Sequence, residues 1–86
     1  MVNVLTELIQ ETHFFFVATG QEAVDSRNLS DKDAIRLFDF ISEELRPENL
    51  QRDGQESVNY IAKRKAFLLK AKKALFDLGF HDKQRN

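Results

Sequence analysis

The stretch from Gln55 to Leu78 constrains the fold of this 86-residue chain most, because it predicts one long helix that is apolar on two sides. On a helical wheel its apolar residues form a broad arc and a smaller arc, with lysines between them. The broad arc contains Tyr60, Ile61, Phe67, Leu68, Ala71, Ala74, Leu75 and Leu78. The smaller arc contains Val58, Ala62, Ala66, Leu69 and Phe76. Apolar helix faces are normally buried, so we expect several neighbours in the chain, or a second chain, to cover this helix on both sides.

The end of the long helix is marked by a glycine. Gly79 suits the left-handed conformation that closes many helices, and Phe80 can then pack back on Leu75, as in a Schellman motif. Residues 81–86 are polar, and we expect them to form a frayed tail.

A first helix is predicted over about residues 3–19, where apolar side chains recur at spacings of three and four. The run from His13 to Val17 would also suit a strand, but the sequence offers no second strand-like run to pair with it. Gly20 weakens a continuous helix, and Thr19 and Glu22 have the spacing of a capping box. We therefore expect the first helix to end there and a short helical piece to follow near residues 20–26.

Residues 31–46 show the most regular helical pattern. Ser30 is expected to be the N-cap, and the acidic residues of the first turn suit the positive end of the helix dipole. Pro47 restricts the residue before it and so ends the helix. A polar connection follows over residues 48–54, in which Leu50 can anchor the loop to the core.

Together these segments predict an all-α fold. We expect a small irregular bundle of three main helices (about 3–19, 31–46 and 55–78), with the short piece near 20–26, packed around the C-terminal helix. The length fits a single domain over residues 1–86. No run approaches the roughly 18 apolar residues of a membrane span, and the N-terminal residues lack the basic start of a signal peptide. The chain also has no cysteines, and we expect a cytoplasmic protein that does not bind membranes.

Charge is divided unevenly along the chain. Residues 1–50 hold ten acidic and four basic residues, a net charge of −6, whereas residues 51–86 hold nine basic and four acidic residues, a net charge of +5. Six of the basic residues lie on the long helix: Lys63, Arg64, Lys65, Lys70, Lys72 and Lys73. These side chains could straddle a nucleic-acid backbone. Alternatively, their stems lie along the apolar arcs and their heads meet acidic residues such as Glu43 and Glu44. The overall charge of −1 favours the second interpretation.

The sequence shows no recognisable catalytic or metal-binding motif. His13 and His81 are far apart, and neither has a histidine or an acidic residue four residues away within the same predicted helix. Glu7 and Glu11 share a helix face, but we expect that face to be open to solvent rather than part of a concave site. The three glycines do not form a phosphate-binding loop. We expect a protein that is not an enzyme and that uses no metal, no cofactor and no small-molecule substrate.

Protein binding is the function that the sequence favours. The chain has eight phenylalanines and one tyrosine, more aromatic side chains than so small a core can hold. Phe14, on the polar side of the first helix, is the best candidate for exposure, unless a bend in that helix or the short piece after Gly20 covers it. We expect a non-catalytic regulatory protein that binds another protein, or a second copy of itself as a homodimer, through a helical surface. Nucleic-acid binding through the basic helix is the alternative. The candidate partner-binding residues are Phe14, Tyr60, Phe67, Lys63, Lys65, Lys70, Lys72 and Lys73.

Overall fold

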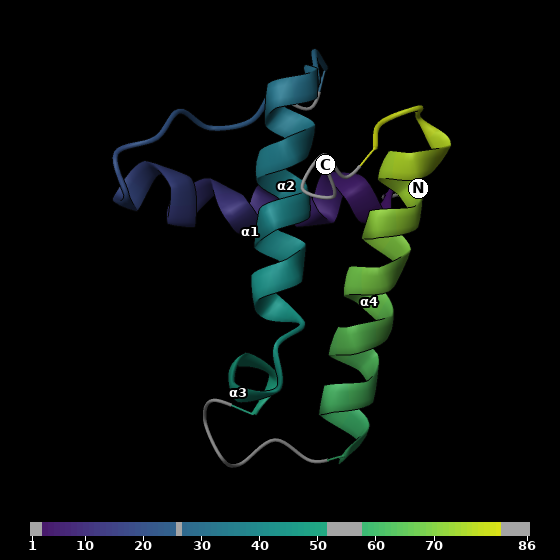
Figure 1. Cartoon of the computed structure of the whole chain (residues 1–86). Coiled ribbons are helices and arrows are strands. Elements are labelled where there is room, and N and C mark those ends of the chain that lie inside the picture. Colours follow the sequence, from purple (N-terminus) through teal and green to yellow (C-terminus); the bar gives the residue numbers. More distant parts are fainter. Residues whose placement is uncertain (1–2, 26, 52–57, 82–86) are drawn as a thin grey trace.

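The computed structural model describes residues 3–25, 27–51 and 58–81, and all regular elements in this part of the chain are helices. They are α1 (Val4–Ala18), α2 (Asp31–Glu44), α3 (Pro47–Leu50) and α4 (Val58–Asp77), shown in Figure 1. The predicted all-α bundle with three main helices is therefore confirmed. Residues 55–57 of the predicted last helix and residues 82–86 of the predicted frayed tail lie outside the described residues.

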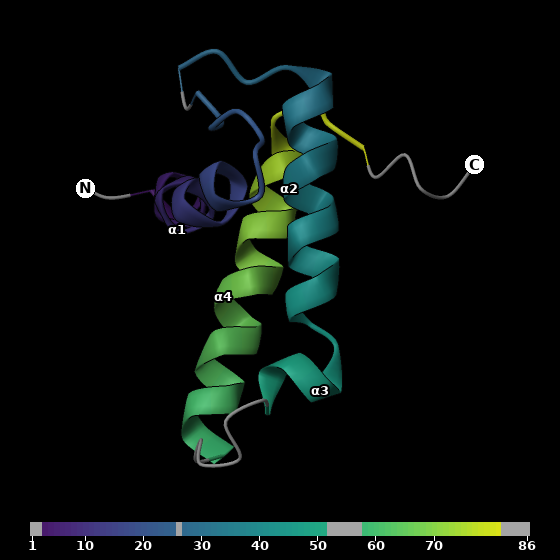
Figure 2. The ribbon, with the colours of Figure 1, turned by 90° about the vertical axis from the view of Figure 1, so that its left-hand side faces the viewer.

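The three long helices are arranged as an antiparallel pair with a third helix lying across it. Helices α2 and α4 run side by side in opposite directions, and α1 crosses behind them in Figure 1. The view in Figure 2 looks along α1 and shows it on one side of the pair. The N-terminal half of α1 lies against α4, whereas its C-terminal half extends past α2. This crossing leaves the C-terminal end of α1 with few neighbours.

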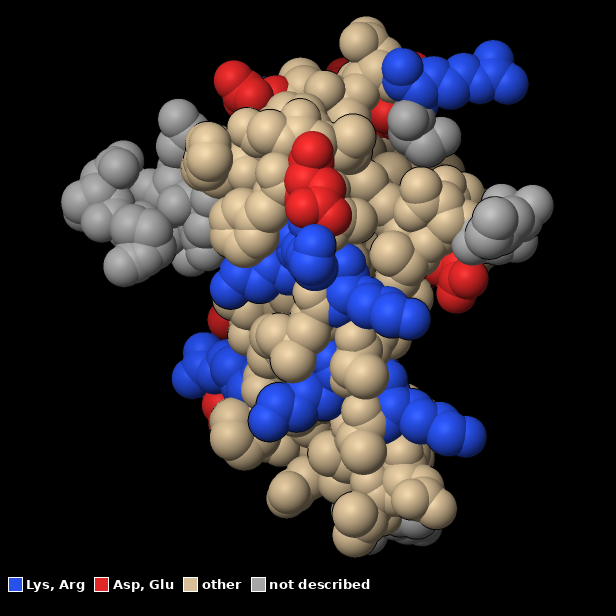
Figure 3. Space-filling view, turned by 90° about the vertical axis from the view of Figure 1, so that its right-hand side faces the viewer, with Lys and Arg blue, Asp and Glu red and all other residues tan. Residues whose placement is uncertain are grey.

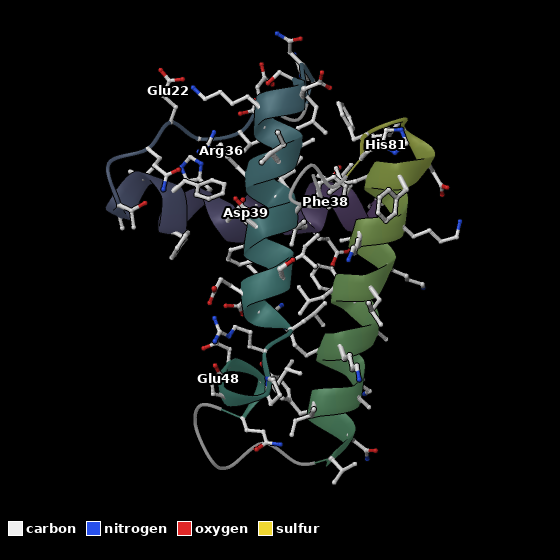
Figure 4. The ribbon with its side chains drawn as sticks, in the orientation of Figure 1. Glu22, Arg36, Phe38, Asp39, Glu48 and His81 are labelled. Carbon is white, nitrogen blue, oxygen red and sulfur yellow. The ribbon has the colours of Figure 1, made fainter. Side chains whose placement is uncertain are left out.

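The core lies between α1 and the α2–α4 pair. Its buried apolar side chains are Leu5, Leu8, Ile9, Phe16, Val24, Ala34, Leu37, Phe38, Ile41, Leu68, Ala71 and Leu75. Thr12 is fully buried among them, and its hydroxyl donates a hydrogen bond to the carbonyl oxygen of Ile9 at 2.9 Å. This bond satisfies a polar group that would otherwise destabilise the core. Phe38 of α2 (labelled in Figure 4) packs against Phe76 of α4, with ring centroids 5.3 Å apart.

Side-chain caps explain where α1 and α2 begin. The Asn3 Oδ1 atom accepts a hydrogen bond from the backbone N–H of Leu5 at 2.8 Å. The Ser30 hydroxyl accepts one from the backbone N–H of Asp33 at 3.2 Å. Each bond satisfies an amide that has no partner inside its helix. The predicted N-cap at Ser30 is confirmed.

Helices α1 and α4 end in the same way, at a glycine with positive φ. Gly20 has φ +80° and Gly79 has φ +96°. The N–H of Phe80 donates to the carbonyl oxygen of Leu75 at 3.1 Å, which is the long hydrogen bond of a Schellman motif. The predicted motif at Gly79 is confirmed.

The predicted short helical piece near residues 20–26 is wrong. The described residues 21–25 are not helical, and Thr19 is the C-cap of α1 rather than the N-cap of a new helix. Its hydroxyl donates backward, to the carbonyl oxygens of Phe15 and Phe16, both at 3.0 Å. The backbone N–H of Gln21 also donates to the carbonyl oxygen of Phe16, at 2.8 Å. The capping-box spacing was thus overridden by the ability of Gly20 to close the preceding helix.

The connection after Pro47 contains one helical turn that the sequence did not predict. Pro47 stands at the start of α3, where its missing N–H is not needed and its fixed φ suits a helix. The Asn49 side chain donates to the carbonyl oxygen of Glu43 at 2.6 Å, which ties this turn to the end of α2. Leu50 is partly buried against the core, so the expectation that it anchors the connection is confirmed.

The smaller apolar arc of α4 is not covered by the described part of the chain. Val58 is 81% exposed and Leu69 is 47% exposed, and Ala62 and Ala66 are also exposed. Phe76 is the member of this arc that packs on α2. Cover on both sides is therefore not supplied by the described residues, and cover of the smaller arc by a second chain stays a prediction. Because α1 crosses the pair instead of running along the far side of α4, α1 and α2 both lie against the broad arc.

Candidate protein-binding groove

An open groove of about 880 Å³ runs between the N-terminal end of α1 and one flank of α4. Its apolar lining consists of Val4 from α1 and Ala66, Phe67 and Ala74 from α4. The two alanines are eight residues apart, so they lie about two turns apart on the same flank of the helix. The charged and polar lining residues are Asn3, Glu7, Lys63, Lys70, Lys73 and Asp77. An apolar floor with charged edges is a common composition for a surface that binds a macromolecule.

Three lysines follow the groove along α4. Lys63, Lys70 and Lys73 are separated by seven and three residues, so their Cα atoms span about 15 Å of the helix axis on one flank. The space-filling view of this side of the molecule in Figure 3 shows Lys and Arg side chains gathered in a band across its middle. The groove therefore presents a row of positive charges beside apolar surface.

Two of these lysines have no acidic partner in the described part of the chain. Lys63 and Lys70 are exposed, and neither forms an ion pair with a described carboxylate. Lys73 pairs with Asp77 one turn later, at 3.2 Å, and both side chains are well exposed. Exposed pairs of this kind contribute little to stability, so Lys73 can exchange its partner at small cost. The groove thus carries three lysines and two carboxylates, and Lys63 and Lys70 are the lysines without a described carboxylate partner.

Arg64 behaves differently from the lysines around it. Its guanidinium is hydrogen-bonded to both carboxylate oxygens of Glu11 on α1 and to Glu44 on α2, the latter at 3.1 Å. It also lies over the ring of Phe67, 5.7 Å from the centroid. Hydrogen bonding to Glu11 raises the pKa of Arg64 well above its ordinary value, although partial burial acts in the opposite direction. Arg64 therefore holds the three long helices together and is not presented to a partner.

The structure divides the predicted partner-binding residues into two groups. Lys63, Lys70, Lys73 and Phe67 line the groove, with Phe67 partly buried against the core. Lys65, Lys72, Tyr60 and Phe14 do not line it. Lys65 is exposed, Lys72 is partly buried, and Tyr60 is half-exposed. Sequence reasoning found the lysines but missed the α1 wall, because nothing in the sequence showed where Val4 and Glu7 would meet α4.

Phe14 is the most exposed aromatic side chain described, at 81%. It belongs to the C-terminal half of α1, which extends past α2 in Figure 1. The segment after Gly20 does not cover it, nor does any other described residue. Its neighbour His13 lies edge-on to the Phe14 ring, with ring centroids 5.7 Å apart. The expectation that Phe14 is exposed is therefore confirmed, but it lies on a different surface from the groove.

A second, smaller hollow of about 380 Å³ lies between α1 and α2. Phe15 and Phe40 line it, with ring centroids 5.7 Å apart. Arg36 also lines it and lies over the ring of Phe16, 4.2 Å from the centroid, while donating to the carbonyl oxygen of Glu22 (Figure 4). About half of the Phe15 side chain is exposed.

Two further kinds of site are absent from the described residues. Within residues 3–25, 27–51 and 58–81, acidic and histidine side chains do not gather in a group able to ligate a metal ion. None of the described helices is both long and apolar enough to cross a membrane.

The fold and the groove place the chain in the class of small all-α proteins with an open basic surface. The chain matches no protein-family model, and comparisons with curated proteins and with solved structures find no match. Its function must therefore be argued from the groove itself.

Proposed function

We propose that this is a non-catalytic interaction protein that binds another protein in the groove between α1 and α4. The observation that carries the proposal is the pairing of an apolar floor with lysines that have no described carboxylate partner. Ion pairs between these lysines and a partner's carboxylates would favour binding, and so would burial of the apolar floor. The absence of cysteine from the sequence suits action in the reducing cytoplasm.

Nucleic-acid binding is the second candidate function, and one observation favours it. Besides Lys63 and Lys70, Lys65 forms no ion pair with a described carboxylate, so several cations of the band in Figure 3 are available to phosphates. Two features weigh against it. Arg64, which belonged to the predicted basic cluster, is engaged by Glu11 and Glu44. In addition, the carboxylates of Glu7 and Asp77 line the groove and would repel a phosphate backbone.

Photo-cross-linking from inside the groove tests the proposed function. A p-benzoylphenylalanine residue replaces Ala66 in the groove, and the matched control carries it at the exposed position Ser42 on α2. Irradiation in an extract of the organism that encodes the chain should give a protein adduct from position 66 alone. Mass spectrometry then identifies the cross-linked protein and the segment in contact. Adducts with nucleic acid, identical adducts from both positions, or no adduct would refute protein binding in the groove.

A further inference from the structure

We propose that the occupant of the groove is an acidic amphipathic helix of a different protein, lying along α4. This inference rests on the proposed function and adds the chemical class of the partner. Three features of the groove carry it: its length and small floor side chains, its row of lysines, and the unsuitability of the chain's own acidic helix as an occupant.

The dimensions of the groove suit a helix of three to four turns. From Lys63 to Asp77 the lining residues follow about 21 Å of the axis of α4, the length of about 14 helical residues. Ala66 and Ala74 keep the floor low, and Phe67 and Val4 form the wall toward α1. Helices pack at axis separations of 8–10 Å when the side chains at the contact are suitable. The alanines provide such a contact.

The charges along the groove select an acidic helix. Lys63, Lys70 and Lys73 lie on one flank of α4 at spacings that match the turns of a helix lying beside it. Glutamates placed one and two turns apart on the occupant would meet these lysines while its apolar side chains cover the alanines. Asp77 and Glu7 lie at the same groove, so a uniformly charged polyanion meets repulsion that a helix with spaced carboxylates can avoid.

A second copy of this chain does not supply the required helix from its described residues. Helix α2 is the acidic helix of the fold, with five acidic and two basic residues between Asp31 and Glu44. However, its apolar face is Ala34, Leu37, Phe38 and Ile41, and all four are buried in its own core. It could offer carboxylates to another copy but no apolar face to the alanines. The described helices of a second copy therefore do not fit the groove, which favours an occupant from another protein.

The test uses the intact protein and three synthetic peptides of about 16 residues, long enough to fill the groove as a helix. The first peptide is amphipathic and acidic, the second has the same composition in scrambled order, and the third carries lysine in place of each glutamate. Fluorescence anisotropy should show the first peptide binding about tenfold more tightly than either control, because only it has both the apolar face and the matching charge. Equal affinities for the three peptides would overturn the inference.

Charge reversal locates the binding site. The double variant Lys63→Glu/Lys70→Glu should weaken binding of the first peptide about tenfold, because two attractions become repulsions. The matched control is Lys65→Glu/Lys72→Glu, which makes the same charge change at the same spacing on the same helix outside the groove. The affinity of the control variant for the first peptide should change by less than about threefold. Thermal melting of both variants checks that they are folded. Similar losses in the two variants would overturn the inference.

Two further measurements distinguish the other occupants. Single-stranded and double-stranded DNA of about 20 nucleotides should both bind more weakly than the acidic peptide. Their binding should not depend selectively on Lys63 and Lys70. Sedimentation velocity of the unmodified protein should show no dimer that disappears in the Lys63→Glu/Lys70→Glu variant. Either opposite result would overturn the inference. If cross-linking from position 66 yields a protein whose contact segment is not an acidic helix, only this inference fails. If no protein adduct forms, the proposed function itself fails.

Discussion

The guanidinium of Arg64 on α4 donates hydrogen bonds to both carboxylate oxygens of Glu11 on α1, although the two residues are 53 positions apart in the chain. The same guanidinium reaches Glu44 on α2 at 3.1 Å. One side chain thus bonds to the helix that crosses the pair and to the partner helix within the pair. Glu11 lies one turn beyond Glu7 on α1, so this contact also sets the position of the α1 wall of the groove.

Removing the Arg64 charge should destabilise the fold more than removing a surface arginine. Arg64→Met removes the guanidinium that pairs with the partly buried Glu44 and the more exposed Glu11, and we expect the free energy of unfolding to fall by about 1–3 kcal/mol. The matched control is Arg46→Met, which breaks two well-exposed ion pairs with Glu43 and Glu48 and should lower the free energy of unfolding much less. Urea unfolding of both variants measures the difference. Equal losses would show that the Arg64 contacts do not hold the helices together.

A pair of adjacent leucines tests which side of α4 is covered. Leu68 is fully buried, and Leu68→Ala should lower the free energy of unfolding by about 2–5 kcal/mol. Leu69 is about half exposed, and Leu69→Ala should cost less than about 1 kcal/mol. Chemical unfolding at low protein concentration makes the comparison. A large loss at Leu69 would mean that the smaller apolar arc is covered after all.

The left-handed cap at the end of α4 can be tested at a single position. Nothing lies within 4 Å of a Cβ atom built on Gly79, so Gly79→Ala should act through its φ of +96° alone. We expect a loss of about 1–2 kcal/mol in the free energy of unfolding. Gly79→Asn should lose less, because asparagine tolerates the left-handed region better. If alanine and asparagine behave alike, backbone strain is not what selects glycine here.

Phe14 and Phe16 should respond to substitution in opposite ways. Phe14→Ala removes an exposed ring and should change the free energy of unfolding by less than about 0.5 kcal/mol. Phe16→Ala empties a core position and should cost about 3–5 kcal/mol. Thermal melting and urea unfolding distinguish the two. Phe14→Ala should also leave binding of the acidic peptide unchanged, and a loss of affinity would place Phe14 in the binding surface.

Much of the fold could be predicted because it depends on local chemistry. The N-cap at Ser30, the stop at Pro47 and the Schellman motif at Gly79 each involve residues close together in the sequence, so spacing alone revealed them. The segment after Gly20 was predicted wrongly because one short pattern allowed two uses. Thr19 and Glu22 fit the start of a helix, while Gly20 fits the end of one, and only the backbone conformation decides between them.

The candidate site was predictable only in part. The lysines and Phe67 could be found because they share one helix. The groove was not predictable, because it depends on the direction in which α1 crosses α4, and no local pattern encodes a crossing direction. The fate of Arg64 illustrates the same limit. The sequence showed it only as one of six basic residues on the long helix, and the positions of α1 and α2 supply the two carboxylates that it binds.

The two walls of the groove come from opposite ends of the chain, residues 3–7 and residues 63–77, and this has a thermodynamic consequence. An unfolded chain does not bring them together, so an occupant binds the folded state alone. At a free concentration 100 times its dissociation constant, it would add about 2.7 kcal/mol to the free energy of unfolding. A variant weakened in the core, such as Leu68→Ala, should then regain stability in the presence of its partner. Under the proposed function, the abundance of this small protein in a cell should therefore follow the supply of its partner.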